Sequence, residues 1–282
     1  MIVTAAIPTV RRVVSRWRRH GRRVAFVPTM GAIHRGHLSL VRRARAAADR
    51  VVVSIFVNPL QFGPSEDYAR YPRPARRDRR LLRAAGVDLL WRPPVRRLYP
   101  PRHRTRVRVE GLSDVLEGAV RPDHFEGVTT VVAKLLNVVQ PHVLWLGQKD
   151  AQQVRVVEQM VEDLDVPVAV RRAPIVREPD GLALSSRNAY LSPEARRQAV
   201  ALVRGLDAAR ALLVSGVRSS ARLRDAIRRV WRRYPAVREG SVAIVDAHTL
   251  RPVRAVRSRI LVAVAAHVGG ARLIDNFEWS PR

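Results

Sequence analysis

The chain has 282 residues, 47% of them hydrophobic, which suits one large α/β domain, alone or with a smaller appendage. It has no cysteine, which excludes disulfide scaffolds and thiol catalysis. Its formal charge of +28 would ordinarily favour a nucleic-acid or anionic-membrane partner, but the arginines are scattered as pairs such as Arg11-Arg12 and Arg228-Arg229, so we expect no specific nucleic-acid partner.

Residues 1–14 contain a short apolar stretch that Pro8 interrupts. The stretch is too brief for a secretory signal, and no window of the chain reaches the length of a membrane span. We therefore expect a cytoplasmic protein without a membrane partner.

The segment 28–37 lies between a strand-like run and a helix-like run. Residues 24–27 are continuously apolar, as in a buried strand of a parallel sheet, and residues 38–44 carry apolar side chains at helical spacing. The segment therefore occupies a turn from a strand into a helix.

This turn has the composition of a phosphate site. Helix N-termini attract anions, and Gly31 and Gly36 allow backbone to approach closely. His34 and His37 are three residues apart, so both rings lie on one face at the helix start if the helix already includes them, and there they could donate hydrogen bonds to a charged group. A helix cap, solvated side chains or half of a metal site remain alternatives, although no cysteine or second histidine pair supplies further ligands.

Strand and helix patterns then alternate, which indicates βαβ units and a parallel sheet. Residues 51–57 form an apolar run, and residues 76–85 and 87–91 have helix and strand patterns. The intervening residues 60–74 are rich in Pro, Gly and aromatic side chains. They are predicted to form a functional loop at the carboxyl end of a strand.

A second strand-to-helix turn follows. A helix pattern over residues 125–139 stops before Pro141, residues 142–146 form a short strand, and residues 147–150 precede a helix over 151–161. On these residues alone, a simple helix cap is favoured over a ligand site.

The pattern changes near residues 174–176. Helices over 193–214 and 219–234 precede strand-like runs at 242–245, 260–265 and 272–275, which indicates a separate α+β domain. Residues 184–188 follow the turn signal Asp180-Gly181, and we expect them to face the first domain across a cleft.

Five separated blocks resemble the pantothenate synthetase (pantoate–β-alanine ligase) family in their order and spacing. The blocks are Pro28-Thr29-Met30-Gly31 with His34-x-Gly36-His37, Val57-Asn58-Pro59-Leu60-Gln61-Phe62, His124-Phe125-x-Gly127-Val128, Gly147-x-Lys149-Asp150 with Gln152-Gln153, and Asp180-Gly181-Leu182-Ala183-Leu184-Ser185-Ser186-Arg187-Asn188. The wider likeness is to nucleotidylyltransferases. The resemblance implies an α/β fold with a Rossmann-like parallel-sheet catalytic domain over residues 1–174 and a smaller α+β lid domain over 175–282.

The resemblance also implies the reaction, in which ATP activates (R)-pantoate as pantoyl adenylate and β-alanine then displaces AMP. It assigns catalysis to His37, as proton donor or charge stabiliser, with His34, Lys149 and Arg187. It implies an ATP site made of Met30, Gly31, Ala32, Ile33, His34, Arg35, Gly36, His37, Gly147, Gln148, Lys149, Asp150, Val176, Leu184, Ser185, Ser186 and Arg187. Pantoate would contact Gln61 and Gln153, and β-alanine would contact Gln61.

Further expectations come from the resemblance alone. They are a homodimer and Mg²⁺ carried by ATP. Gln148 and Ala151 depart from the Glu and the aromatic residue usual in the family, and the basic block Ala75-Arg76-Arg77-Asp78 leaves no protein ligand assigned to the metal. Two rival functions remain at this stage, an adenylate-forming enzyme that acts on a different acid and an arginine-rich nucleic-acid-binding protein.

Overall fold

The computed structural model describes residues 1–64 and 66–281, which separate into two compact units. The first unit holds Met1–Gln148 and Gln153–Pro174. The second holds Lys149–Gln152 and the chain described from Ile175 onward. Within the described chain, no helix is both long and apolar enough to cross a membrane.

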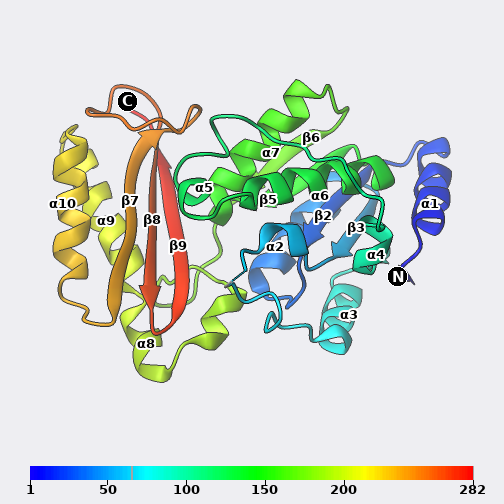
Figure 1. Cartoon of the computed structure of the whole chain (residues 1–282), viewed down its shortest axis with the longest axis horizontal. Helices are drawn as coiled ribbons and strands as arrows, with labels where there is room; N and C mark the ends of the chain where they lie inside the picture. The colour runs from blue at the N-terminus through cyan, green and yellow to red at the C-terminus, as the bar shows by residue number, and fades with distance from the viewer. Residues whose placement is uncertain (65, 282) are drawn as a thin grey trace. The chain divides into compact units, whose positions relative to one another are not determined.

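The first unit is built on a six-stranded sheet with the order β1-β4-β3-β2-β5-β6 (Figure 1). Every neighbouring pair for which a register is defined is parallel. The strands are β1 (Ile2–Thr4), β2 (Val24–Thr29), β3 (Arg50–Ile55), β4 (Leu89–Trp91), β5 (Val143–Gly147) and β6 (Ala169–Ala173). The predicted Rossmann-like parallel sheet is therefore confirmed.

Helices cover both faces of this sheet. On one face Val27 and Val53 pack with Leu40 of α2 and Leu82 of α3. Phe26 alternates with Val27 along β2 and so points to the opposite face. The helices α1 and α6 contact β2 and each other. The helices of this unit are α1 (Ile7–Arg19), α2 (Arg35–Ala47), η1 (Pro59–Gln61), α3 (Ala75–Ala84), α4 (Val95–Leu98), α5 (Glu117–Val120) and α6 (His124–Val139), together with most of α7 (Ala151–Asp163).

Two edges of the sheet were not predicted. The sequence suggested that Pro8 breaks the first apolar stretch. Pro8 instead lies in the first turn of α1, where a missing backbone N–H costs little. The preceding β1 pairs with β4. At the other edge, β6 includes Arg171 and Arg172 and has alternating exposed residues, so no apolar run marked it.

The second unit combines a three-stranded antiparallel sheet with helices, as predicted. Its strands are β7 (Val237–Asp246), β8 (Ile260–Val268) and β9 (Ala271–Trp279), in that order. The described helices here are η3 (Ser186–Tyr190), α8 (Pro193–Gln198), α9 (Ala201–Val214) and α10 (Ser220–Trp231), and η2 (Gln148–Asp150) crosses between the units. The single helix expected over 193–214 is thus divided into α8 and α9.

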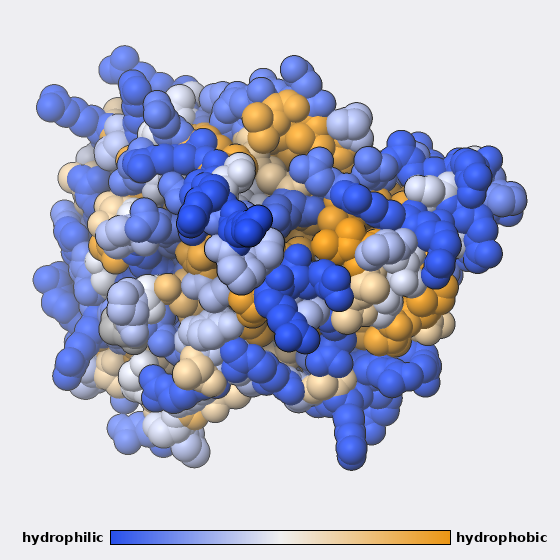
Figure 2. Space-filling view, turned by 45° about the vertical axis from the view of Figure 1, so that its right-hand side comes forward, coloured by the Kyte–Doolittle hydropathy of each residue, from blue (hydrophilic) through white to orange (hydrophobic). Residues whose placement is uncertain are grey.

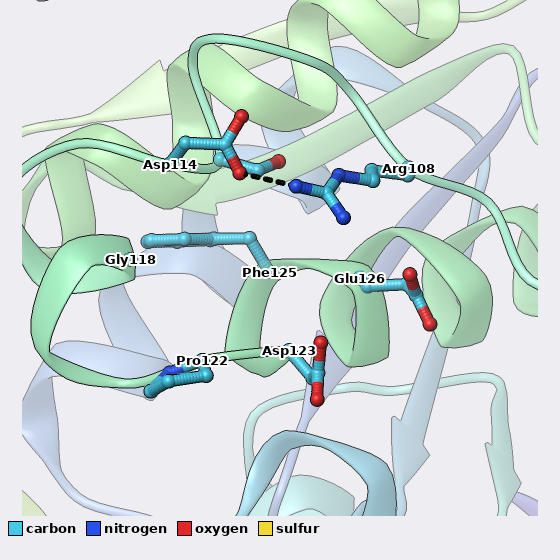
Figure 3. Close-up of a pocket in the computed structure, with 8 residues that line it drawn as sticks. Arg108, Asp114, Gly118, Pro122, Asp123, Phe125 and Glu126 are labelled. Atoms are coloured by element: carbon cyan, nitrogen blue, oxygen red, sulfur yellow. Dashed lines mark hydrogen bonds and ion pairs between the residues drawn. The ribbon is translucent and has the colours of Figure 1, made fainter.

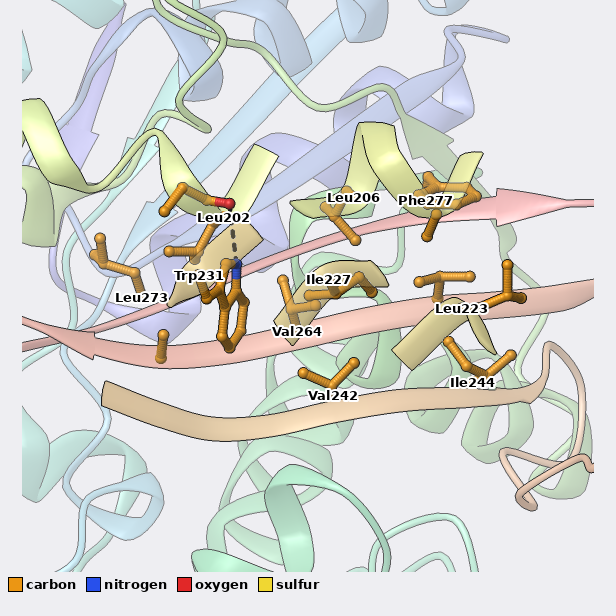
Figure 4. Close-up of a cluster of buried hydrophobic side chains, with 14 of the residues drawn as sticks. Leu202, Leu206, Leu223, Ile227, Trp231, Val242, Ile244, Val264, Leu273 and Phe277 are labelled. Atoms are coloured by element: carbon orange, nitrogen blue, oxygen red, sulfur yellow. Dashed lines mark hydrogen bonds between the residues drawn. The ribbon is translucent and has the colours of Figure 1, made fainter. Parts of the chain in front are cut away.

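Apolar side chains from α9, α10 and all three strands form the core of the second unit (Figure 4). Trp231 is 4% exposed and donates its indole N–H to the carbonyl of Ala201 at 2.9 Å. A Cβ at Gly205 would lie 2.8 Å from that indole nitrogen, so glycine permits this close packing. Gly269 and Gly270, both at positive φ, make the tight turn between β8 and β9.

Strongly hydrophilic residues cover much of the face seen in Figure 2, and hydrophobic residues appear between them in separate groups. Several surface arginines pair with carboxylates, as in Arg228 with Glu239 at 2.8 Å. Exposed pairs of this kind contribute about 0–1 kcal/mol each to stability. The core rather than the surface charge therefore dominates the folding energetics.

Candidate functional site

The 28–37 segment, called the 28–37 loop below, comprises the end of β2, residues 30–34 and the first turn of α2, and it lies at the point where the strand order of the first sheet reverses. From β2 the chain proceeds to β3 and β4 on one side, whereas β5 pairs with the other side of β2. Because these strands are parallel, their carboxyl ends share one edge, and open α/β sheets bind ligands at such a reversal. Gly147 ends β5 at this same edge.

The shape of the 28–37 loop depends on a carboxylate from α3. Gly31 has φ +88° and Ala32 φ +51°, both in the left-handed region. Asp78, only 1% exposed, accepts the Ala32 N–H at 2.9 Å and the Ile33 N–H at 2.8 Å. A Cβ at Gly31 would lie 3.1 Å from Asp78 Oδ2 and 3.0 Å from Ile55 Cγ2. Asp78 therefore fixes the backbone of this loop.

The two predicted histidines lie together, but only one belongs to the helix. α2 begins at Arg35, and His34 is its N-cap with an extended backbone, so the helix does not include both histidines, which was the condition for the predicted shared face. The ring centroids are nevertheless 4.1 Å apart. His34 Nδ1 accepts the Gly36 N–H at 3.1 Å, and His37 Nδ1 accepts the His34 N–H at 3.4 Å. Since an accepting Nδ1 carries no proton, the neutral rings carry theirs on Nε2.

Gln61 is the last residue of η1, and its side chain is oriented by Asn58 and Met30. Its Oε1 accepts from Asn58 Nδ2 at 3.1 Å, and its Nε2 contacts Met30 Sδ at 3.2 Å. Asn58 is 1% exposed, donates to the Gly127 carbonyl at 2.9 Å and accepts the Tyr99 hydroxyl at 2.9 Å. Burial raises the pKa of Tyr99, which keeps this hydroxyl protonated as a donor. Buried Asn58 therefore fixes the orientation of the Gln61 side-chain amide.

In the part that the structure describes, the predicted 60–74 loop is held by an ion pair to Arg121, which follows α5, and by a hydrogen bond to His124 at the start of α6; residue 65 lies outside the described residues. Arg121 donates Nε to Glu66 Oε1 at 2.7 Å and Nη2 to Oε2 at 2.5 Å. Arg121 and His124 both contact the Gln61 carbonyl. Arg73 donates to the carbonyls of Tyr68 and Tyr71, which closes the loop on itself.

Gln148 belongs to the first unit, and the second unit carries the remaining predicted ATP residues on two segments. Lys149 and Asp150 belong to η2, and Lys149 Nζ lies 3.8 Å from Asp150 Oδ1. Val176 and Leu184 are joined by a backbone hydrogen bond of 2.9 Å. Ser185 caps η3 by accepting the Arg187 N–H at 3.2 Å, which turns the Ser185-Ser186-Arg187 segment tightly.

The structure therefore divides the predicted site residues between the units. The first unit brings together the 28–37 loop, Gln61 and the end of β5, and Gln153 lies partly buried in α7. Lys149, Asp150, Val176 and Leu184–Arg187 belong to the second unit. Sequence reasoning missed Asp78 and Tyr99 as supporting residues, because each acts on a segment more than 40 positions away.

A small pocket in the first unit contains none of the predicted site residues. Figure 3 shows Arg108 paired with Asp114 at 2.7 Å beside it. The residues that line it are Arg108, Ser113, Asp114, Gly118, Pro122, Asp123, Phe125 and Glu126. Among residues 1–64 and 66–281, no group of three or more His, Asp or Glu side chains is arranged to hold a metal ion.

Comparisons with known proteins agree with this fold. Residues 2–278 match the pantoate–β-alanine ligase family. A pantothenate synthetase of Heliobacterium modesticaldum is 54% identical over 258 residues, 92% of each chain. The crystal structure of pantothenate synthetase from Thermus thermophilus matches all of both chains with a TM-score of 0.95 at 50% identity. A pantoate–β-alanine ligase from Francisella tularensis, complexed with β-γ ATP and β-alanine, gives a TM-score of 0.80 at 32% identity, covering 98% of this chain and 97% of that one.

Proposed function

The chain belongs to the pantoate–β-alanine ligase family and joins pantoate to β-alanine with ATP as a substrate, and we propose which of its residues hold these molecules. The observation that carries the proposal is the 28–37 loop. It combines a helix N-terminus with two imidazoles at the reversal of the strand order. Helix N-termini and Nε2–H donors both favour an anionic ligand such as a triphosphate.

The chemistry explains why positioning and charge suffice. The pantoate carboxylate is ionised near neutral pH, so it attacks the α-phosphorus without a protein base or nucleophile. Its C–O–P bond forms as pyrophosphate leaves, and negative charge gathers on the phosphate oxygens and the leaving group. His37, His34, Lys149 and Arg187 are proposed to stabilise that charge.

The amide side chains suit the carboxylic acid. Gln61, held by Asn58, and Gln153 are proposed to orient pantoate through hydrogen bonds, with Gln61 also contacting β-alanine. A neutral amide orients a carboxylate without stabilising it as strongly as a cation would, so its attack is not weakened. The second step requires neutral β-alanine amine to attack the adenylate carbonyl and expel AMP.

Water must be kept from the adenylate until that attack. The 60–74 loop, whose Glu66 pairs with Arg121 at the end of α5, is proposed to form part of the shielding wall. Lys149 and Leu184–Arg187 of the second unit are proposed to bind ATP as well.

Mg²⁺ is proposed to enter as part of the ATP complex. Both oxygens of Asp78 accept backbone N–H groups, and Asp150 lies beside Lys149, so these carboxylates are already engaged. Phosphate oxygens and water would supply most of the ligands, as is usual for Mg²⁺ bound with nucleotides. A homodimer and a cytoplasmic location are likewise proposed from the family alone.

Variants within α7 test the pantoate assignment. We expect Gln153→Ala to raise the KM for pantoate roughly tenfold, which is about 1.4 kcal/mol of binding, with little change in the KM for ATP. Gln159→Ala is the matched control, because Gln159 lies on the same helix and bonds Arg155 and Asp163 instead. An unchanged KM for pantoate in Gln153→Ala would remove that residue from the pocket. Pantoate-independent AMP formation by the parent would contradict the reaction itself.

A further inference from the structure

The last strand of the second unit contacts both segments that carry its predicted ATP residues. Asp275 and Asn276 are consecutive in β9 and are 2% and 3% exposed. Consecutive side chains of a strand point to opposite faces of the sheet. Two consecutive residues of one strand can therefore contact two different segments, one on each face of the sheet.

Asp275 shares its face of β9 with Leu273 and Phe277, which belong to the hydrophobic core. An ionised carboxylate in such surroundings is costly unless it is paired and hydrogen-bonded. Arg177 supplies that pairing with two bonds, Nη1 to Oδ2 at 2.6 Å and Nη2 to Oδ1 at 2.9 Å. The Asn276 N–H adds a third at 2.8 Å. The pair anchors Arg177 firmly to β9.

Arg177 belongs to a short hairpin that leads into the predicted phosphate-binding segment. Its Nη1 also donates to the Gly181 carbonyl at 2.9 Å, and it bridges Ala183 across the hairpin. The hairpin is closed by the Leu184 N–H to the Val176 carbonyl. Holding Arg177 therefore fixes Val176 and Leu184, and with them the start of the Ser185-Ser186-Arg187 turn.

Asn276 holds the other segment. Its Nδ2 donates to the backbone carbonyl of Lys149 at 2.9 Å, across 127 positions of sequence. Lysine is a flexible point charge on a four-carbon stem, so its use as a phosphate ligand depends on where its backbone is placed. Fixing the backbone lowers the entropic cost of presenting the ammonium group.

We propose that Asp275 and Asn276 are positioning residues for ATP, Asp275 acting through Arg177 on the 176–187 segment and Asn276 acting through Lys149. This inference rests on the proposed roles of Lys149 and Leu184–Arg187 in binding ATP. Neither Asp275 nor Asn276 is proposed to touch the substrate.

A double-mutant cycle tests the Asn276 branch. The readout is kcat/KM for ATP in pantoate-dependent exchange of pyrophosphate into ATP. We expect Asn276→Ala to lower kcat/KM for ATP roughly 10- to 100-fold in the parent, as misplacement of a binding group does. In a Lys149→Ala background, the same substitution should lower kcat/KM for ATP by less than about twofold. An equal loss in both backgrounds, or no loss in the parent, overturns the proposal. If the parent showed no exchange of pyrophosphate into ATP, the proposed function itself would be contradicted.

The Asp275 branch is tested by comparing KM values. Asp275→Asn removes the charge that pairs with Arg177, and we expect the KM for ATP to rise roughly tenfold while the values for pantoate and β-alanine stay within about twofold. Leu273→Val is the matched control, because it weakens the core on the same face and leaves the Arg177–Asp275 ion pair in place, and it should lower Tm but not raise the KM for ATP. If Asp275→Asn does not fold, Arg177→Gln serves instead, because it removes the partly exposed partner of the same ion pair. It should raise the KM for ATP in the same way. Equal changes in all three KM values, or an ATP effect in Leu273→Val, contradict the proposal.

Discussion

The carboxylate of Asp78 accepts the backbone N–H of Ile33 at 2.8 Å, although 45 positions of sequence separate the two residues. Its second oxygen accepts the N–H of Ala32, whose φ is positive. A single buried side chain of α3 thereby sets the conformation of the loop that precedes His34. This links the packing of α3 to the proposed nucleotide site.

Replacing Asp78 with Ala should weaken both stability and ATP binding. The buried Ile33 N–H would lose its acceptor, at about 1–3 kcal/mol, the partly buried Ala32 N–H would lose the same acceptor, and the loop would lose its fixed shape. We expect a lower Tm and a raised KM for ATP with a nearly unchanged KM for β-alanine. Asp88→Asn is the control, because Asp88 accepts the Val51 N–H at 2.8 Å in the same unit. Parental ATP kinetics in Asp78→Ala, or an equal ATP effect in Asp88→Asn, would rule out the link.

Two glycine substitutions should separate stability from binding. A Cβ at Gly127 would lie 2.3 Å from the Leu60 carbonyl oxygen, whereas nothing lies within 4 Å of a Cβ at Gly147. Gly127→Ala must therefore displace η1 and Gln61, and we expect a loss of roughly 1–3 kcal/mol in unfolding free energy with a higher KM for pantoate. Denaturant unfolding and initial-rate kinetics measure both quantities.

Gly147→Ala should instead leave the unfolding free energy within about 0.5 kcal/mol of the parent and raise the KM for ATP, because the added methyl group would occupy space proposed for the nucleotide. A Gly147→Ala variant with unchanged ATP kinetics would argue against Gly147 in the ATP site. Equal stability loss in the two variants would contradict the packing argument.

His142 should make stability depend on mildly acidic pH. Burial, followed by the charges of Arg18 and Arg23, lowers the pKa of His142 from its ordinary value of 6.5, and its Nδ1 accepts the Val24 N–H at 3.0 Å. Because the pKa of His142 is lower in the folded state than in the unfolded state, neutral His142 contributes to the stability of the fold. This contribution is complete above about pH 6.5 and is lost as the pH falls through the folded pKa. Unfolding free energies at pH 7.5 and 5.5 should differ more in the parent than in His142→Gln. The same difference in both proteins would exclude this histidine as the source.

The sequence predicted the elements whose signals are local. The apolar run at 24–27 and the helical spacing at 38–44 lie within β2 and α2, because burial imposes those periods directly on neighbouring residues. The edge strands β1 and β6 were missed, because β1 is too short and β6 too exposed and arginine-rich to leave an apolar pattern.

Supporting contacts of the site were also beyond sequence reasoning. Asp78 in a basic block gave no sign that its carboxylate is buried, and nothing near Lys149 in the sequence indicated that it groups with the second unit, where Asn276 donates to its carbonyl. Such contacts join distant segments and follow only from the assembled fold. The assignment of ATP and pantoate to individual residues remains a prediction.

The rate of AMP release from ATP with Mg²⁺, measured with pantoate and β-alanine separately and together, tests the central claim most directly. The account predicts steady AMP formation only with both substrates, falling roughly 10²- to 10³-fold in His37→Ala, as when one charge-stabilising donor is removed. His20→Ala should keep the parental rate, because that ring bonds only the Arg16 carbonyl of its own helix among the contacts described. Parental rates in His37→Ala, or steady AMP formation without pantoate, would contradict the account.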